Sequence, residues 1–201
     1  MDAYVQDLHC GQIQGMTTRP VDNIFGNLEF AHCVKSLCAE RGLDLRTQVA
    51  IISPDAGGVP RAKHLKECTG AGGLAFIVKQ RAGAGVVDSM DLIGDVAGKV
   101  CVIVDDLCDT GGTLCRAAAV LRDHGAIDVI GCITHGLFCG SALDHINDSV
   151  FSKLFVTNTL YQGDNVTRCA KLEVIDIAPL LAKVIRRSYS SSSISALFEY
   201  K

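Results

Sequence analysis

Carboxylates, glycines and hydroxyls are concentrated directly after an apolar run in the middle of the chain. Residues 100–104 are all apolar, and they are followed by Asp105, Asp106, Asp109, Thr110, Gly111, Gly112 and Thr113. Glycine lets a phosphate approach the backbone, and amides and hydroxyls at the start of a helix can donate hydrogen bonds to it. Carboxylates can accept hydrogen bonds from sugar hydroxyls or hold waters around a divalent cation. One such aspartate alone would more often be a solvated turn residue, but the whole order predicts a loop that binds a sugar phosphate.

Two further segments place polar residues after apolar runs. Residues 49–52 are followed by Asp55, Ala56, Gly57 and Gly58, and Arg61 comes at the start of a presumed helix. Backbone without bulky side chains can approach a polyphosphate there, although the stretch alone would also fit an unliganded turn. Residues 74–85 run from an apolar strand into a basic, glycine-rich loop that holds Lys79 and Arg81. Such loops can close over a substrate and exclude water. The sequence contains neither a P-loop motif nor a complete dinucleotide fingerprint.

The elements that must position these residues alternate between strands and helices. We expect strands near residues 4–8, 48–53, 74–79, 100–104, 127–134, 153–158 and 172–176, and helices near residues 28–41, 60–69, 113–124, 140–148 and 178–188. This alternation predicts an α/β fold in which a doubly wound, mainly parallel sheet carries helices on both faces. Residues 91–99 are expected to form a short hairpin. We expect the bends at Asp55 and Asp109 to lie at neighbouring strand tips and to form one pocket.

Together the segments resemble ribose-phosphate diphosphokinases, also called phosphoribosyl pyrophosphate (PRPP) synthetases, which have the type I phosphoribosyltransferase fold. Residues 100–113 are similar to the family's PRPP motif, residues 48–61 to its pyrophosphate loop, and residues 5–23 to the signature around its magnesium-binding histidine. The likeness continues in the same order to residue 198, so it covers almost the whole chain. Phosphoribosyltransferases share only the PRPP loop, so the resemblance is specific to PRPP synthetases.

The resemblance implies a reaction and a role for each segment. The reaction is transfer of pyrophosphate from Mg·ATP to ribose 5-phosphate, which gives PRPP and AMP. The implied ribose 5-phosphate site is Asp105, Asp106 and residues 109–113, and the implied pyrophosphate site is Asp55, Ala56, Gly57 and Gly58. The implied Mg²⁺ site is Asp7, His9, Asp22 and Asp55, while Lys79 and Arg81 would stabilise charge on the transferred group. The family usually has an acid where this chain has Thr18, so one of its metal contacts has no counterpart here.

The likeness begins at a strand that lies late in the family's amino-terminal domain. We therefore expect residues 1–25 to be a remnant of that domain carrying the metal-site His9, residues 26–187 to be the phosphoribosyltransferase-like domain, and residues 188–201 to be a tail. Most of the domain that binds ATP in the family is expected to be absent. Ser193 and Ser195, in the expected tail, match a family segment that helps form an inhibitory nucleotide site.

Two alternatives remain beside the synthetase itself. A non-catalytic regulatory subunit, associated with a full-length synthetase, is favoured by the expected absence of the ATP half, whereas retention of Lys79, Arg81 and Asp105 weighs against it. A phosphoribosyltransferase that uses PRPP is disfavoured because no nucleobase-specific element is recognisable. The resemblance also implies that the chain forms homo-oligomers or associates with a full-length synthetase.

Composition limits the partners and the compartment. The chain has 201 residues, 48% of them hydrophobic, which is enough for one self-contained core. A net charge of −3 gives no electrostatic case for nucleic acid or for an anionic membrane. No apolar run has membrane-spanning length, and the first residues lack the features of a signal peptide, so a cytoplasmic protein is expected.

The ten cysteines contain no Cys-x-x-Cys pair and are expected to be free thiols. Cys108, inside the sugar-phosphate loop, is expected to be open to alkylation.

Overall fold

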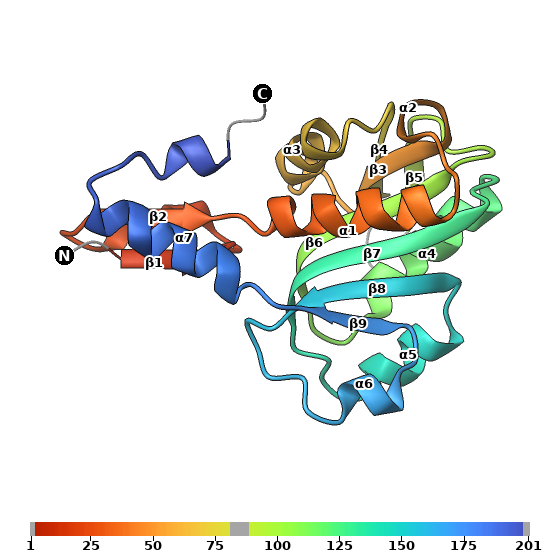
Figure 1. Ribbon diagram of the computed structural model, residues 1–201. Helices are drawn as coiled ribbons and strands as arrows, with labels where there is room; N and C mark the ends of the chain where they lie inside the picture. The colour runs from red at the N-terminus through yellow and green to blue at the C-terminus, as the bar shows by residue number, and fades with distance from the viewer. Residues whose placement is uncertain (1–2, 81–88, 199–201) are drawn as a thin grey trace.

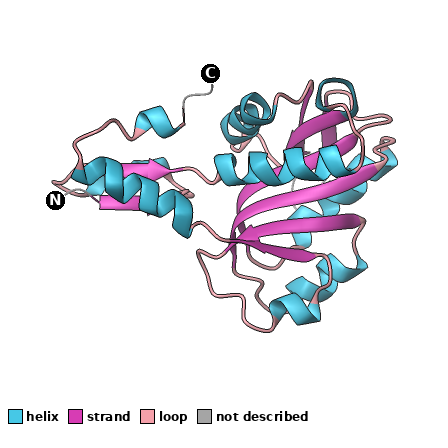
Figure 2. Ribbon diagram, in the orientation of Figure 1, coloured by secondary structure: helices cyan, strands magenta, loops and turns pink. Residues whose placement is uncertain are grey.

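The computed structural model describes residues 3–80 and 89–198, and its centre is a seven-stranded sheet (Figures 1 and 2). The strand order is β5-β4-β3-β6-β7-β8-β9. The strands are β3 (Val49–Ser53), β4 (Gly73–Gln80), β5 (Ser89–Ile93), β6 (Val100–Cys108), β7 (Asp128–Gly136), β8 (Phe151–Thr157) and β9 (Leu172–Ile175). Neighbouring strands are parallel except β4 and β5, which are antiparallel. The prediction of a mainly parallel α/β sheet is confirmed.

Helices cover both faces of this sheet. One face carries α1 (Asn27–Glu40) and α3 (Val59–Thr69), and the other carries α4 (Gly112–Asp123) and α5 (Ala142–Asp148). Two single turns, α2 (Leu45–Gln48) and α6 (Asn165–Arg168), lie in the connections.

Strand β6 shows why its sequence is apolar without interruption. Its alternate residues Val100, Val102 and Val104 are buried in the core beneath α1 and α3. Cys101 and Ile103 are buried in the core beneath α4 and α5. Both faces of the strand are therefore dry, which is typical of parallel sheets, and full burial of each Val or Ile side chain contributes about 1.5–3 kcal/mol. This strand leads directly into the loop of residues 109–111 at its carboxyl end, for which sugar-phosphate binding is predicted.

A second, smaller unit lies beyond one end of the sheet. Strands β1 (Ala3–Gln6) and β2 (Val21–Ile24) form a two-stranded parallel sheet, with the 3₁₀ turn η1 (Gly11–Met16) between them. Helix α7 (Ala178–Tyr189) and the turn η2 (Ser195–Leu197) lie beside it in Figure 1. Leu180 and Val184, one turn apart on α7, are buried against Ile24.

Three elements differ from the sequence-based expectation. Strand β2 was not predicted, because its four residues include the polar Asp22 and Asn23. Helix α7 extends across the expected domain boundary at residue 187, and its apolar side packs on β1 and β2 instead of on the main sheet. Residues 91–99 do not form a hairpin by themselves, because β5 pairs with β4 and the chain turns at Gly94. At Gly94 the backbone φ is 117°, and a Cβ would lie 2.6 Å from that of Ala75, so only glycine fits.

The cysteines are free, and their burial differs from site to site. All ten cysteines are free thiols, and six of them are buried. Within residues 3–80 and 89–198, no helix combines the length and the apolar character needed to cross a membrane. Cys108, however, is only 3% exposed, and burial raises the pKa of its thiol to about 12. The expectation that Cys108 is open to alkylation in the folded chain is therefore wrong.

Candidate functional site

The two predicted bends lie at the same edge of the sheet. Strands β3 and β6 are parallel neighbours, with Ile52 aligned to Ile103. The bend that contains Asp55 and the bend that contains Asp109 therefore follow adjacent strand tips, as expected. In open α/β sheets, ligands bind outside the carboxyl ends of the strands.

The loop of residues 109–113, predicted to bind the sugar phosphate, is held by the connection between β7 and α5 and by α5 itself. Strand β6 extends to Cys108, so Asp105 and Asp106 belong to the strand itself. The backbone N–H of Cys139 donates to the carbonyl of Asp109 at 3.0 Å, and His145 Nδ1 donates to the carbonyl of Thr110 at 3.0 Å. Gly111 has a φ of 74°, which favours glycine, and α4 begins at the next residue. Free N–H groups at the start of this helix, together with Thr110 and Thr113, can bind an anion.

The second bend is a tight turn with an open backbone. Ser53 Oγ donates to the carbonyl of Asp55 at 2.6 Å, and the Gly58 N–H donates to Asp55 Oδ1 at 2.9 Å. Asp55 is therefore partly used within its own turn. Ala56 and Gly57 are exposed at the tip. A ligand can approach the backbone there without meeting a large side chain.

Arg61 links this bend to the acidic residues on the neighbouring strands. It lies in the first turn of α3, and its Nη2 atom is 3.1 Å from Asp7 Oδ1 and 3.8 Å from Asp106 Oδ2. Its Nη1 atom is 4.0 Å from Asp105 Oδ1. The sequence placed Arg61 only at the start of a helix. The signal that could have identified Arg61 as a site residue is its position three residues after Gly58. That spacing places it in the first helical turn after the bend, close to the carboxyl ends of the strands.

Asp7 is enclosed by protein donors. It is fully buried and has a φ of 46°, which is uncommon for a residue other than glycine. Arg61 binds its Oδ1 atom, and Thr134 Oγ1 donates to its Oδ2 atom at 2.5 Å. His135 Nε2 donates to the Asp7 carbonyl at 3.2 Å. Both carboxylate oxygens are thus engaged, and neither faces solvent.

The two aspartates of β6 have opposite pKa shifts. Burial, followed by hydrogen bonding and repulsion from Asp106, raises the pKa of Asp105 to about 7. Burial also acts to raise the pKa of Asp106, but hydrogen bonding to Asp105 and the charges of Arg61 and His9 outweigh it and lower that pKa. His9 Nδ1 lies 2.7 Å from Asp106 Oδ2. The pair therefore offers one carboxylate that ionises readily and one that holds its proton longer.

Side chains suited to Mg²⁺ are present but do not form a closed cage. The His9 side chain is 81% exposed, and Asp22 is exposed on β2. Among residues 3–80 and 89–198, no three His, Cys, Asp or Glu side chains converge as a metal-binding group. Mg²⁺ usually keeps several waters and takes one or two carboxylates together with substrate phosphates. His9 and Asp22 are open to such an arrangement, whereas both carboxylate oxygens of Asp7 already accept from protein donors.

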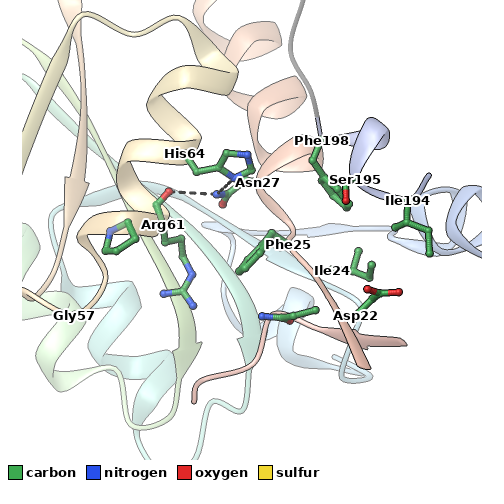
Figure 3. A pocket seen from close by; sticks show the side chains of 12 residues that line it. Asp22, Ile24, Phe25, Asn27, Gly57, Arg61, His64, Ile194, Ser195 and Phe198 are labelled. Carbon is green, nitrogen blue, oxygen red and sulfur yellow. Dashed lines mark hydrogen bonds between the residues drawn. The ribbon is translucent and has the colours of Figure 1, made fainter. Parts of the chain in front are cut away.

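A cavity of about 530 Å³ adjoins the cluster on the side of β2 and α3 (Figure 3). The cavity is lined by residues of β2, α1, α3 and the segment around η2, among them Asp22, Asn27, Arg61, Ser195 and Phe198. Asn27 Nδ2 donates to the carbonyl of Arg61 at 3.2 Å and lies 2.9 Å from His64 Nδ1. Ser195, from a segment expected to be a tail, thus lines the same cavity as Arg61.

Of the two basic residues predicted to act on the transferred group, Lys79 is exposed near the end of β4. Ser53, the last residue of β3, aligns with Phe76 of β4, so Lys79 lies beyond the carboxyl tip of β3. It is therefore at the same edge of the sheet as the two bends. Arg81 lies outside the residues that the structure describes.

Known proteins resemble the chain in sequence and in fold. The family model described as phosphoribosyl synthetase-associated domain matches residues 78–199. The ribose-phosphate pyrophosphokinase of Hyphomonas neptunium is 39% identical over 193 residues, which cover 96% of this chain and 60% of that protein. The ribose-phosphate pyrophosphokinase of Vibrio parahaemolyticus is 42% identical over 192 residues, with 96% and 59% covered.

A solved structure agrees with these relatives. The phosphoribosylpyrophosphate synthetase of Mycobacterium smegmatis superposes with a TM-score of 0.82 at 34% sequence identity, covering 95% of this chain and 59% of that one. The chain spans about 60% of the length of the curated relatives it matches. The family match, the curated relatives and the fold agree: the chain belongs to the ribose-phosphate pyrophosphokinase (PRPP synthetase) family.

Proposed function

We propose that the chain binds ribose 5-phosphate and takes part in transfer of pyrophosphate from Mg·ATP to its anomeric hydroxyl, giving PRPP and AMP. The observation that carries the proposal is the adjacency of the two bends across β3 and β6. One bend offers helix-terminal N–H groups and hydroxyls for a 5-phosphate, and the other offers open backbone for a diphosphate. PRPP carries both groups on one ribose.

The proposed roles follow from the chemistry of each side chain. Residues 109–113 hold the 5-phosphate, and Asp105 and Asp106 accept hydrogen bonds from the ribose hydroxyls. Ala56, Gly57 and Gly58 admit the pyrophosphate. Phosphoryl transfer of this kind depends on alignment of the attacking oxygen with the phosphorus and on stabilisation of negative charge. Lys79, together with Arg81, would supply the positive charge.

Mg²⁺ is the proposed cofactor, held with the substrate phosphates by His9, Asp22 and Asp55. When bound, it would neutralise charge on the transferred group. The sequence implied Asp7 as a further ligand. Its engaged oxygens favour a supporting role through Arg61 instead.

A second candidate function is that of a subunit that associates with a full-length synthetase. It is favoured by the small β1–β2 sheet of the described chain, since each of its two strands has an edge that a strand of a partner could extend even with α7 packed on the sheet. Either function would be served by an oligomer, which the family resemblance also implies.

Assay of AMP release from ATP and ribose 5-phosphate separates the candidates. The full chain is assayed alone and mixed with the Vibrio parahaemolyticus relative, and Asp109→Asn is compared with Asp123→Asn at the other end of α4. Turnover by the chain alone that Asp109→Asn abolishes supports the first candidate. Altered turnover only in the mixture supports the second. A chain that releases no AMP, binds no ribose 5-phosphate and leaves the relative unchanged would contradict both.

A further inference from the structure

We infer that Arg61 is a positioning residue that holds Asp105 and Asp106 in the orientation required by ribose, and that buried Asp7 fixes Arg61 in turn. This inference rests on the proposed function, because it assigns a role within the same sugar-phosphate site. Asp7 then acts in the site through the arginine and not by touching the ligand.

The geometry places one cation among three carboxylates that come from different parts of the chain. Arg61 is 3.1 Å from Asp7 at the end of β1, and 3.8 Å and 4.0 Å from Asp106 and Asp105 of β6. Its side chain is 13% exposed, and that of Asp7 is fully buried. The short contact is therefore with Asp7, and the two longer contacts are with Asp105 and Asp106, the aspartates proposed to bind ribose.

Burial makes this arrangement specific. Asp7 accepts from both Nε and Nη2 of Arg61, at 3.4 Å and 3.1 Å, and from Thr134 on its other oxygen. Removing the partner of a buried carboxylate strongly destabilises the folded protein, because an unpaired charge remains in the interior. The pairing of Asp7 Oδ1 with Arg61 is therefore strongly preferred. The Arg61 backbone is also fixed, because Asn27 donates to its carbonyl. Two anchors thus determine where the guanidinium points.

The charge balance explains why the two β6 aspartates need this cation. Asp105 and Asp106 are consecutive, and their mutual repulsion disfavours two ionised groups. Arg61 lies within 4.0 Å of Asp105 Oδ1 and Asp106 Oδ2, so its charge offsets that repulsion. A lysine keeps the charge but ends in a single ammonium group, so it cannot serve Asp7 and the β6 pair in one fork geometry.

The role predicts a change in ligand affinity that loss of stability alone would not produce. The probe is ribose 5-phosphate, titrated calorimetrically into the full chain and its variants. Arg61→Gln should weaken binding about tenfold or more, since the positive charge that pairs with Asp105 and Asp106 is lost. Arg61→Lys should lie between this variant and the unaltered chain. Lys63→Gln makes the same change on an exposed position of the same helix and should bind within about twofold of the unaltered chain.

Thr134→Val is the control for stability, because it removes the other donor to Asp7 and leaves Arg61 in place. It should lower the melting temperature yet keep the affinity for ribose 5-phosphate. If Arg61→Gln does not fold, Asp7→Asn tests the same link, and it should also weaken binding. Unchanged affinity in Arg61→Gln or in Asp7→Asn, or an equal loss in Thr134→Val, would overturn the inference alone. Absence of binding to the unaltered chain would overturn the proposed function and this inference with it.

Discussion

The guanidinium of Arg61 lies between Asp7 and Asp106, with its Nη2 atom 3.1 Å from one carboxylate and 3.8 Å from the other. Asp7 follows β1 in the small unit, whereas Asp106 lies in the central strand of the main sheet. This pair of contacts therefore connects the two units at the carboxyl ends of the strands, where the bends after β3 and β6 lie. The geometry of the candidate site therefore depends on the relative position of the two units.

Asp105 should make stability depend on pH. Its carboxyl ionises near its ordinary pKa of 3.8 in the unfolded chain, but burial raises that pKa to about 7 in the folded chain. Between these values the folded state binds more protons, so its free energy of unfolding falls as pH rises. Asp105→Asn lacks this titration. Urea denaturation should show the variant gaining stability relative to the unaltered chain from about pH 4 to about pH 7, with no further change above. A difference that does not vary with pH would contradict the assignment.

Thiol labelling should follow exposure and not proximity to the site. Cys10 and Cys139 are exposed, whereas Cys108 is 3% exposed and has a raised pKa because of burial. Brief treatment of the folded chain with iodoacetamide should modify the two exposed cysteines first and leave Cys108 unreacted. Mass spectrometry of peptides identifies the sites, and labelling in urea provides the control in which Cys108 reacts. Early modification of Cys108 in the folded chain would mean that the β6 loop opens.

Lys171 should contribute to stability by binding the end of α5. Its Nζ atom donates to the carbonyls of Ile146, Asn147 and Ser149 at 3.1, 2.8 and 2.7 Å. A cation at the carboxyl end of a helix is favourable, and its removal takes a charged donor from all three carbonyls, of which that of Ile146 still accepts from Ser149. Lys171→Ala should lower the free energy of unfolding by about 1–3 kcal/mol. The exposed Lys183→Ala on α7 is the control and should cost about 0.5 kcal/mol or less, so equal effects would refute the role.

Lys79 should affect turnover without affecting folding. It is exposed beyond the carboxyl tip of β3, where the diphosphate is proposed to bind. Removal of a contact that stabilises charge in the transition state typically lowers turnover by about 10²–10³. Lys79→Ala should show a loss of that order in AMP release, with an unchanged melting temperature. Lys63→Ala on α3 serves as the matched control, and an unchanged kcat in Lys79→Ala would refute the proposed role.

Local patterns in the sequence predicted the sheet and the two bends, because burial on both faces of a strand and glycine after a strand leave short-range signals. The strand predicted at 100–104 extends to Cys108, since Asp105, Leu107 and Cys108 continue the pairing with β7. The contacts of Arg61 could not be predicted in this way. They join positions 7, 61 and 106, which are far apart in the sequence and share no periodicity.

The packing of the small unit could not be predicted from the sequence either. The apolar side of α7 is visible in its periodicity, but its partner Ile24 lies in a strand of four residues with two polar side chains. The resemblance implied Asp7 as a metal ligand because of its position in a motif. Burial and the Thr134 hydrogen bond became visible only in three dimensions.

The most direct measurement compares the binding of PRPP and of ribose 5-phosphate to the full chain and to two variants, each with a larger residue in place of one glycine in one of the two bends. A Cβ at Gly112 meets no atom within 4 Å, and one at Gly57 meets only Asp55 Oδ1 at 3.4 Å, so a side chain can be added at either position without a clash at its Cβ. Gly112→Val should weaken both ligands, because both carry the 5-phosphate. Gly57→Val should weaken PRPP by about tenfold or more and leave ribose 5-phosphate unchanged, because only PRPP carries the diphosphate. Unchanged PRPP affinity in Gly57→Val would contradict a single pocket built from the two bends.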